Sequence, residues 1–218
     1  SDSLSALVLH YHIEGGYENH QQLVFSPNTA TQFNQLTHDR LDTPMEPYPL
    51  KKVEIPSADL GNRGLLFAGI GWYTRLEFPY LNNIMEHGEY VHIEKAGLKI
   101  YPEYGTYSDF NALPDSIFLY IADENNVVTD AVKDYLGKQV QGGKLVKDDL
   151  FLGNTYYYFD VTQFMKEELG ASGKYKHNLQ LVFNSDDYTK TLKNLTFSAP
   201  NGQNPIILQL NYKIYESY

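Results

Sequence analysis

Short segments in which apolar residues alternate with other residues recur along this chain, and they constrain its fold more than any other feature. A period of two is typical of a β-strand, because successive side chains of a strand point to opposite faces of a sheet. The chain also contains 19 Tyr and 11 Phe, and aromatic residues favour the pleated surface of a sheet. Strands are predicted at residues 7–13, 21–25, 65–70, 73–78, 91–101, 116–122, 144–146, 155–159, 178–183, 191–197 and 205–215.

Two short helices are predicted to interrupt these strands. Pro79 suits the first position of a helix, and Gly88 lies where a C-terminal glycine would end it. The second helix is expected between Asp160 and Gly170, with the Asp160 carboxylate accepting from the amide of residue 163 and the Gln163 side chain reaching back. Many short strands with only two helices favour an all-β, antiparallel β-sandwich of jelly-roll type over a parallel α/β sheet.

The length of the chain is compatible with one β-sandwich, and we expect residues 1–218 to form a single domain. A chain of this size buries roughly 70% of the surface that its unfolded form exposes, which is sufficient for folding without disulfides or a structural metal. Residues 30–56 are mostly polar and contain four prolines. This stretch therefore predicts a long excursion over the surface.

Charge and composition exclude several classes of function. The chain has 27 acidic and 17 basic residues, which give a net charge of −10. Such a charge repels a phosphate backbone, so we expect no nucleic-acid partner. No run approaches the roughly 20 apolar residues of a spanning helix, and we expect membrane contact only through a lipid anchor upstream of Ser1. The absence of cysteine excludes thiol catalysis and zinc–thiolate sites.

Aromatic residues gather in the segment 101–110, which also contains Pro102 and Gly105. Exposed rings offer stacking faces to a sugar, and acidic side chains accept hydrogen bonds from its hydroxyl groups. The segment therefore predicts a carbohydrate-binding surface, with the alternative that its rings cap an edge of the sandwich. The predicted ligand-binding residues are Trp72, Tyr73, Tyr101, Tyr104, Tyr107 and Asp109.

Two kinds of residue could hold a metal ion. His10 and His12 lie two apart on a strand and face the same side, and His20 could supply a third ligand. Acidic residues at turns suit a structural Ca²⁺ ion, the one cofactor that we consider. A polar sheet face and solvated turns are the alternative explanations. The acidic candidates are Asp115, Asp123, Glu124, Asp148, Asp149, Asp186 and Asp187.

Catalytic groups are less evident than binding groups. His38 is followed by Asp39, which could orient its imidazole for base chemistry, but a loop hydrogen bond is the explanation that we favour for this pair. Glycoside hydrolysis would require two carboxylates that face each other across a cleft. No nucleophile motif accompanies these residues. We therefore expect a protein that is not an enzyme, and a glycoside hydrolase is the less favoured interpretation.

Several segments spread over most of the chain carry a family resemblance. They are Phe33-Asn34 with His38-Asp39, and the stretches at 74–79, 93–98, 158–164 and 204–212. Together they resemble a family of Bacteroidetes cell-envelope lipoproteins described only as a domain of unknown function. The second half also resembles the jelly-roll modules of bacterial surface and adhesion proteins, in which an Asp-Val-Thr unit caps a helix and a Pro-led strand closes the domain.

This resemblance implies an exported protein that is periplasmic or anchored to the outer membrane. It implies no reaction and no catalytic residues. We expect a non-catalytic module of the cell envelope or cell surface that binds a glycan or another envelope component. The alternative is a structural or assembly subunit with a face that binds an envelope protein.

Overall fold

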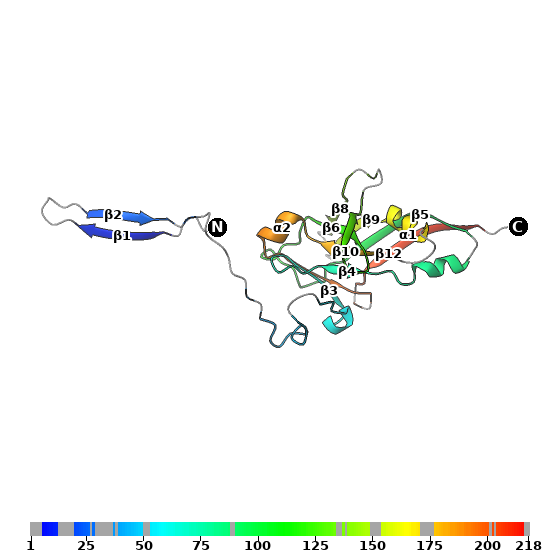
Figure 1. The fold of residues 1–218 in the computed structure, drawn as a ribbon, viewed down its shortest axis with the longest axis horizontal. Helices are drawn as coiled ribbons and strands as arrows, with labels where there is room; N and C mark the ends of the chain where they lie inside the picture. Colours follow the sequence, from blue (N-terminus) through cyan, green and yellow to red (C-terminus); the bar gives the residue numbers. More distant parts are fainter. Residues whose placement is uncertain are drawn as a thin grey trace. The chain divides into compact units, whose positions relative to one another are not determined.

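The protein is described by a computed structural model, which is drawn as a ribbon in Figure 1. Its packing separates two compact units, Ser1–Asp39 and Arg40–Tyr218, which are described one after the other. The expectation that all 218 residues form one domain stays a prediction. The described residues are 6–12, 20–26, 28, 37, 39–49, 53–87, 90–133, 137, 139–148, 154–170, 177–200, 202 and 204–215.

The first unit contains an antiparallel hairpin of β1 (Leu7–His12) and β2 (His20–Phe25). Its register pairs Leu7 with Phe25 and His12 with His20. The predicted strands at 7–13 and 21–25 are therefore confirmed apart from their ends. All six side chains of β1 are exposed.

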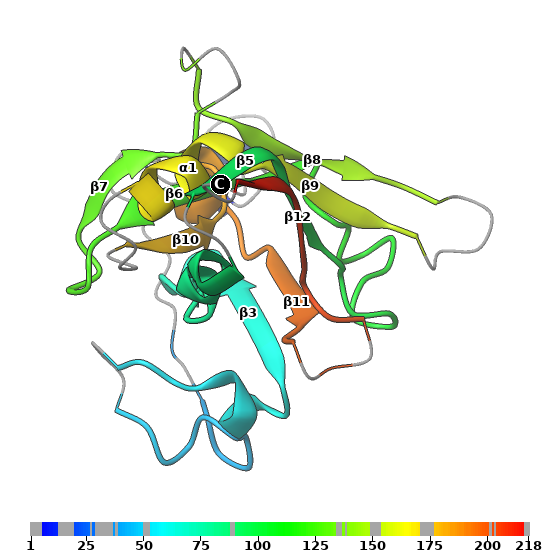
Figure 2. The same ribbon diagram turned by 90° about the vertical axis from the view of Figure 1, so that its right-hand side faces the viewer.

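The second unit is built around an eight-stranded antiparallel sheet. Seven of its strands follow the order β12-β5-β9-β8-β6-β10-β4, and the eighth, β7, pairs with β6. Its strands are β4 (Thr74–Leu76), β5 (Tyr90–Ile100), β6 (Ser116–Ala122), β7 (Val128–Ala131), β8 (Gly142–Val146), β9 (Tyr156–Asp160), β10 (Asn178–Val182) and β12 (Ile207–Tyr215). A second sheet pairs β3 (Arg63–Phe67) with β11 (Asn194–Ser198). Figure 2 shows this pair facing the curled large sheet. The prediction of an all-β, antiparallel sandwich is confirmed.

The core lies between these layers. On β5, Leu98 and Ile100 are fully buried, and they belong to one apolar cluster with Leu66 of β3 and Phe197 of β11. Tyr157 is buried between two half-buried tyrosine neighbours, because successive side chains of β9 point to opposite faces of the sheet. Its hydroxyl donates to the Pro114 carbonyl over 2.6 Å, and burial raises the pKa of this phenol well above its usual range.

The helices differ in part from the sequence prediction. The first is a 3-10 helix, η2 (Leu81–His87), which begins two residues after Pro79, and Gly88 lies outside the described residues. The second is α1 (Thr162–Gly170). Two further short helices, η1 (Ser57–Leu60) and α2 (Ser185–Lys190), were not predicted from the sequence. Asn184 is the N-cap residue of α2, and its side chain accepts from the Asp187 amide over 2.7 Å.

The predicted capping role of Asp160 is wrong in detail. Asp160 is the last residue of β9, and α1 begins two residues later, at Thr162. The Asp160 carboxylate accepts from the Thr162 amide over 3.0 Å, instead of from the amide of residue 163. Gln163 pairs with Glu167. The Thr162 hydroxyl accepts from the Ala96 amide over 2.9 Å. Residues 160–162 therefore fasten the junction between β9 and α1 to β5.

Glycines opposite aromatic rings allow the strands to pack closely. A Cβ atom on Gly64 would lie 2.2 Å from a ring carbon of Phe197, and one on Gly143 would lie 2.1 Å from a ring carbon of Phe159. Both rings are almost fully buried. Because a buried ring has no free space into which it can move, each position requires a residue without a side chain.

Gly143→Ala is expected to destabilise the protein by about 1–3 kcal/mol, because the new methyl group overpacks the core at Phe159. The free energy of unfolding can be measured by urea denaturation of the full chain. The matched control is Gly142→Ala, whose Cβ would lie 3.4 Å from the nearest atom, a carbon of the Phe118 ring. Equal losses in the two variants would contradict the role of the Phe159 contact.

Asp160→Ala is expected to cost about 1 kcal/mol, because the variant loses the hydrogen bonds from Thr162 at the start of α1. In a chain of this size this corresponds to a melting temperature about 2–4 °C lower. Thermal unfolding followed by circular dichroism measures the shift. An unchanged melting temperature would show that the junction does not depend on this carboxylate.

Candidate functional site

The aromatic segment 101–110 lies along the outer edge of β11. The Glu103 amide donates to the Thr196 carbonyl over 2.8 Å, and Pro102 forms a bridge with Phe197. Arg63 binds both oxygens of the Glu103 carboxylate, at 2.7 and 2.6 Å. The segment is therefore held by both strands of the smaller sheet.

The predicted ligand-binding residues of this segment do not form one surface. Tyr104 is 74% exposed, and Asp109 is exposed as well. Burial raises the pKa of Tyr107, with a further contribution from nearby Tyr104. Tyr101 instead packs against Tyr156 of β9, with ring centroids 5.6 Å apart. The structure thus brings Tyr104 close to Tyr107 and directs Tyr101 towards the large sheet.

Trp72 and Tyr73 lie on the other side of the smaller sheet. Trp72 forms a bridge with Phe67 on the edge of β3 that does not pair with β11. The Arg40 guanidinium lies 5.4 Å from the centroid of the Trp72 ring. Two strands, β3 and β11, therefore separate these residues from the segment 101–110. The carbohydrate site predicted for the six residues stays a prediction, but their backbones do not gather at one place.

A groove of about 430 Å³ lies on the large sheet, over β5, β9 and β12. We call it the β5–β9 groove. Its residues are Lys95, Gly97, Lys99, Val146, Tyr156, Tyr158, Gln209 and Asn211. They alternate along their strands with core residues such as Leu98, Tyr157 and Phe159, so the groove lies on the face of the sheet opposite the core. Its volume falls within the range of small-ligand sites in proteins.

Two tyrosines and a glycine shape the β5–β9 groove. The tip of the Tyr158 ring lies over Gly97, where a Cβ atom would be 2.9 Å from the ring carbon Cε2 and from the hydroxyl oxygen. The Lys99 ammonium lies 5.0 Å from the centroid of the Tyr156 ring, a cation–π contact. Gly97 therefore leaves the space that Tyr158 occupies, and Lys99 and Tyr101 flank Tyr156.

The polar groups of the groove are available to a ligand. Gln209 lies opposite Gly97 and Asn211 opposite Lys95 in the pairing of β12 with β5. Neither amide side chain forms a hydrogen bond with another described residue. An amide offers both donors and an acceptor. Amides next to aromatic rings provide the hydrogen bonds and the apolar surface that a sugar ring requires.

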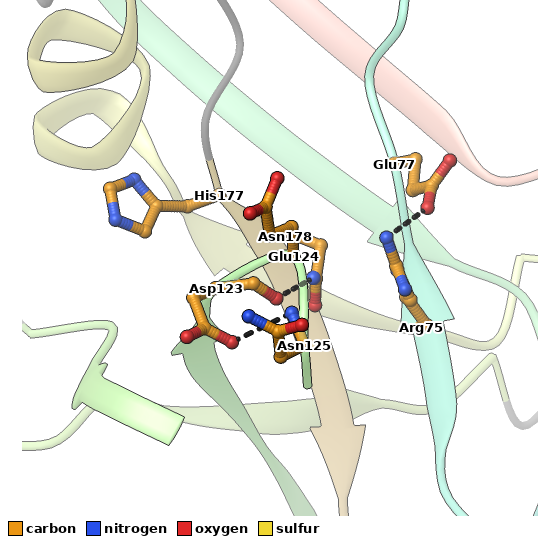
Figure 3. Close-up of a pocket in the computed structure, with 7 residues that line it drawn as sticks. All are labelled: Arg75, Glu77, Asp123, Glu124, Asn125, His177 and Asn178. Atoms are coloured by element: carbon orange, nitrogen blue, oxygen red, sulfur yellow. Dashed lines mark hydrogen bonds and ion pairs between the residues drawn. The ribbon is translucent and has the colours of Figure 1, made fainter. Parts of the chain in front are cut away.

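A second hollow, of about 510 Å³, is shown in Figure 3; we call it the turn pocket. It is lined by Arg75, Glu77, Asp123, Glu124, Asn125, His177 and Asn178. The Asp123 side chain accepts from the amides of Asn125 and Val127, both at 2.9 Å, and so stabilises the turn between β6 and β7. Arg75 pairs with Glu54 at 2.8 Å and with Glu77 at 2.6 Å.

The remaining groups of the turn pocket are also largely engaged. His177 Nδ1 lies 2.5 Å from an oxygen of the buried Glu168 carboxylate. The Asn178 side chain donates to the Asp123 carbonyl over 2.8 Å. Among the described residues, Asn178 Oδ1 and Arg75 Nε are buried without a hydrogen-bond partner. The charges of this pocket therefore serve mainly to stabilise one another.

No three His, Asp or Glu side chains converge on a possible metal site within the part of the chain that the structure describes. His10 and His12 are exposed on β1, and the side chain of His20 lies outside the described part. His38 and Asp149 are also outside it. Asp186 pairs with Lys190 and Asp187 with Lys193, at 3.0 and 2.9 Å. A structural Ca²⁺ ion and a loop hydrogen bond of the His38–Asp39 pair both stay untested expectations.

Comparisons with known proteins find no matching family model, no matching curated protein and no matching solved structure. The resemblance to envelope lipoproteins therefore stays a prediction. Among the described residues, no helix has the length and apolar character needed to cross a membrane.

Gly97→Ala is expected to change the β5–β9 groove at little cost in stability. Its methyl group would meet only the far end of the Tyr158 side chain, which can rotate away, and alanine lowers the entropy of the unfolded chain. The free energy of unfolding should change by less than about 1 kcal/mol. A crystal structure of the variant should show the Tyr158 ring displaced from residue 97. A loss as large as that of Gly143→Ala would contradict this account.

Proposed function

We propose that this protein is a non-catalytic binding module and that its ligand is a glycan held in the β5–β9 groove. The observation that carries the proposal is the combination, on one sheet face, of Tyr156 and Tyr158 with the amides of Gln209 and Asn211, which form no hydrogen bond with another described residue. Sugars present apolar C–H faces and many hydroxyl groups. Aromatic rings and amides on a rigid sheet complement both features.

The resemblance to cell-envelope lipoproteins and surface modules supports a place in the bacterial envelope, periplasmic or anchored to the outer membrane by a lipid. A glycan of the envelope or of the surroundings would be the corresponding ligand. The turn pocket supports a hydrolase less well. Its Asp123 carboxylate holds the turn and its Glu77 pairs with Arg75, so neither is free for acid–base work on a substrate.

A protein-binding role is the second candidate, and the edge of β12 favours it. This strand is nine residues long and lies at the end of the sheet order. Tyr212, Ile214 and Tyr215 are 40–51% exposed there. An extended segment of a partner protein could pair with such an edge.

Tyr156→Ala with Tyr158→Ala is expected to weaken glycan binding about tenfold or more, because two stacking surfaces are lost. Binding can be found on a glycan array and its affinity measured by calorimetry, after both proteins have been shown to melt alike. The matched control is Tyr104→Ala with Tyr107→Ala, which removes two tyrosines of the originally predicted segment and leaves the groove intact.

Loss of binding in the control variant alone would place the sugar on the segment 101–110 and contradict the groove. If no glycan bound the unaltered protein, the glycan proposal would fail. A partner protein whose binding is lost in Tyr212→Lys would then support the β12 edge as the functional surface.

A further inference from the structure

We propose that the glycan bound in the β5–β9 groove is acidic, and that Lys95 and Lys99 bind its negatively charged groups. This inference rests on the proposed function and specifies the class of its ligand. The shared chemistry is an anionic substituent on the sugar, either a carboxylate or a sulfate.

The groove has a charge opposite to that of the whole protein. The chain carries 27 acidic residues against 17 basic ones, yet the lining of the groove includes two lysines and no acidic residue. The turn pocket, by comparison, is lined by Glu77, Asp123 and Glu124 with one arginine. The β5–β9 groove is therefore a local basic site on an acidic protein, where an anion gains attraction.

The two lysines are not used for internal ion pairs. Neither Lys95 nor Lys99 forms a salt bridge with any carboxylate that the structure describes. Other lysines of the same unit do so: Lys133 pairs with Asp130 at 2.8 Å, and Lys213 pairs with Glu94 on the neighbouring strand β5. An anionic ligand would provide Lys95 and Lys99 with the partner that these other lysines already have.

The position of the lysines fits an elongated sugar chain. They lie two residues on either side of Gly97 and on the same face of β5, so their Cα atoms are about 13 Å apart in an extended strand. Tyr158 covers Gly97 between them, and Gln209 lies opposite this glycine on β12. A sugar ring against Tyr158 would therefore have a cation on each side along the strand.

The experiment compares acidic glycans with neutralised forms of the same chains. Calorimetry would use oligogalacturonate and its methyl ester for the carboxylate, and a sulfated galactan oligosaccharide and its desulfated form for the sulfate. An array of further acid–neutral pairs would extend the panel. We expect the acidic member of a pair to bind about tenfold more tightly, as the loss of two charge-assisted contacts implies. The pair that shows this preference identifies the anionic group.

The protein variants test whether the two lysines are responsible. Lys95→Met with Lys99→Met should remove the preference for the acidic form, whereas Lys166→Met with Lys190→Met, on α1 and α2, should retain it. Both double variants change the formal net charge from −10 to −12, so the control corrects for the overall charge. Equal weakening in the two double variants would overturn the inference.

The outcomes separate this inference from the proposed function. If neutral and acidic forms bind equally and both are lost in Tyr156→Ala with Tyr158→Ala, the groove binds glycan but the charge inference is wrong. If acidic glycans bind equally well without the two tyrosines, binding is general charge attraction and the inference is also wrong. If no glycan in the panel binds, the proposed function itself fails.

Discussion

Close contact between aromatic rings and glycines is the constraint on which the rest of the structure depends. Phe159 occupies the space beside Gly143 in the core, and Phe197 does the same beside Gly64 in the smaller sheet. Tyr158, the neighbour of Phe159 on β9, covers Gly97 on the opposite face. Because adjacent side chains of a strand point to opposite faces, β9 contributes to the core and to the groove through consecutive residues. The packing that stabilises the sandwich also holds the groove in place.

A sheet face gives the groove a rigidity that a loop site would lack. β5 pairs with β12 from Tyr90 to Lys99 and with β9 from Gly97 to Ile100, so the strand is held along both edges at Gly97 and Lys99. The junction at residues 160–162 adds hydrogen bonds from the start of α1 to the Ala96 backbone of the same strand. The backbone that carries these side chains is therefore already ordered before a ligand binds.

The sequence predicted the strands well because alternation is a local property: residues 116–122 were predicted with the same ends as β6. β7 was missed, since Val128–Ala131 is short and lacks a clear apolar alternation.

The β5–β9 groove was missed for another reason. It depends on β5 lying next to β9 and β12, and a periodic pattern does not say which strands are neighbours. A glycine inside a predicted strand, Gly97, was the one local signal of a close approach. The aromatic residues of the segment 101–110 stand close together in the sequence, but Tyr101 packs against Tyr156 of the large sheet, whereas Pro102 and Glu103 contact β11 of the smaller one.

The β5–β9 groove and the turn pocket differ in how they use their polar groups, and this difference favours the groove as the binding site that we propose. In the turn pocket, Arg75 is held by Glu54 and Glu77, and Asp123 is held by its own turn. A ligand there would have to break interactions that stabilise the fold. In the β5–β9 groove, the amides of Gln209 and Asn211 make no hydrogen bond to another described residue. A ligand can bind these two amides without breaking a hydrogen bond that the structure describes, so these contacts add to the stability of the complex.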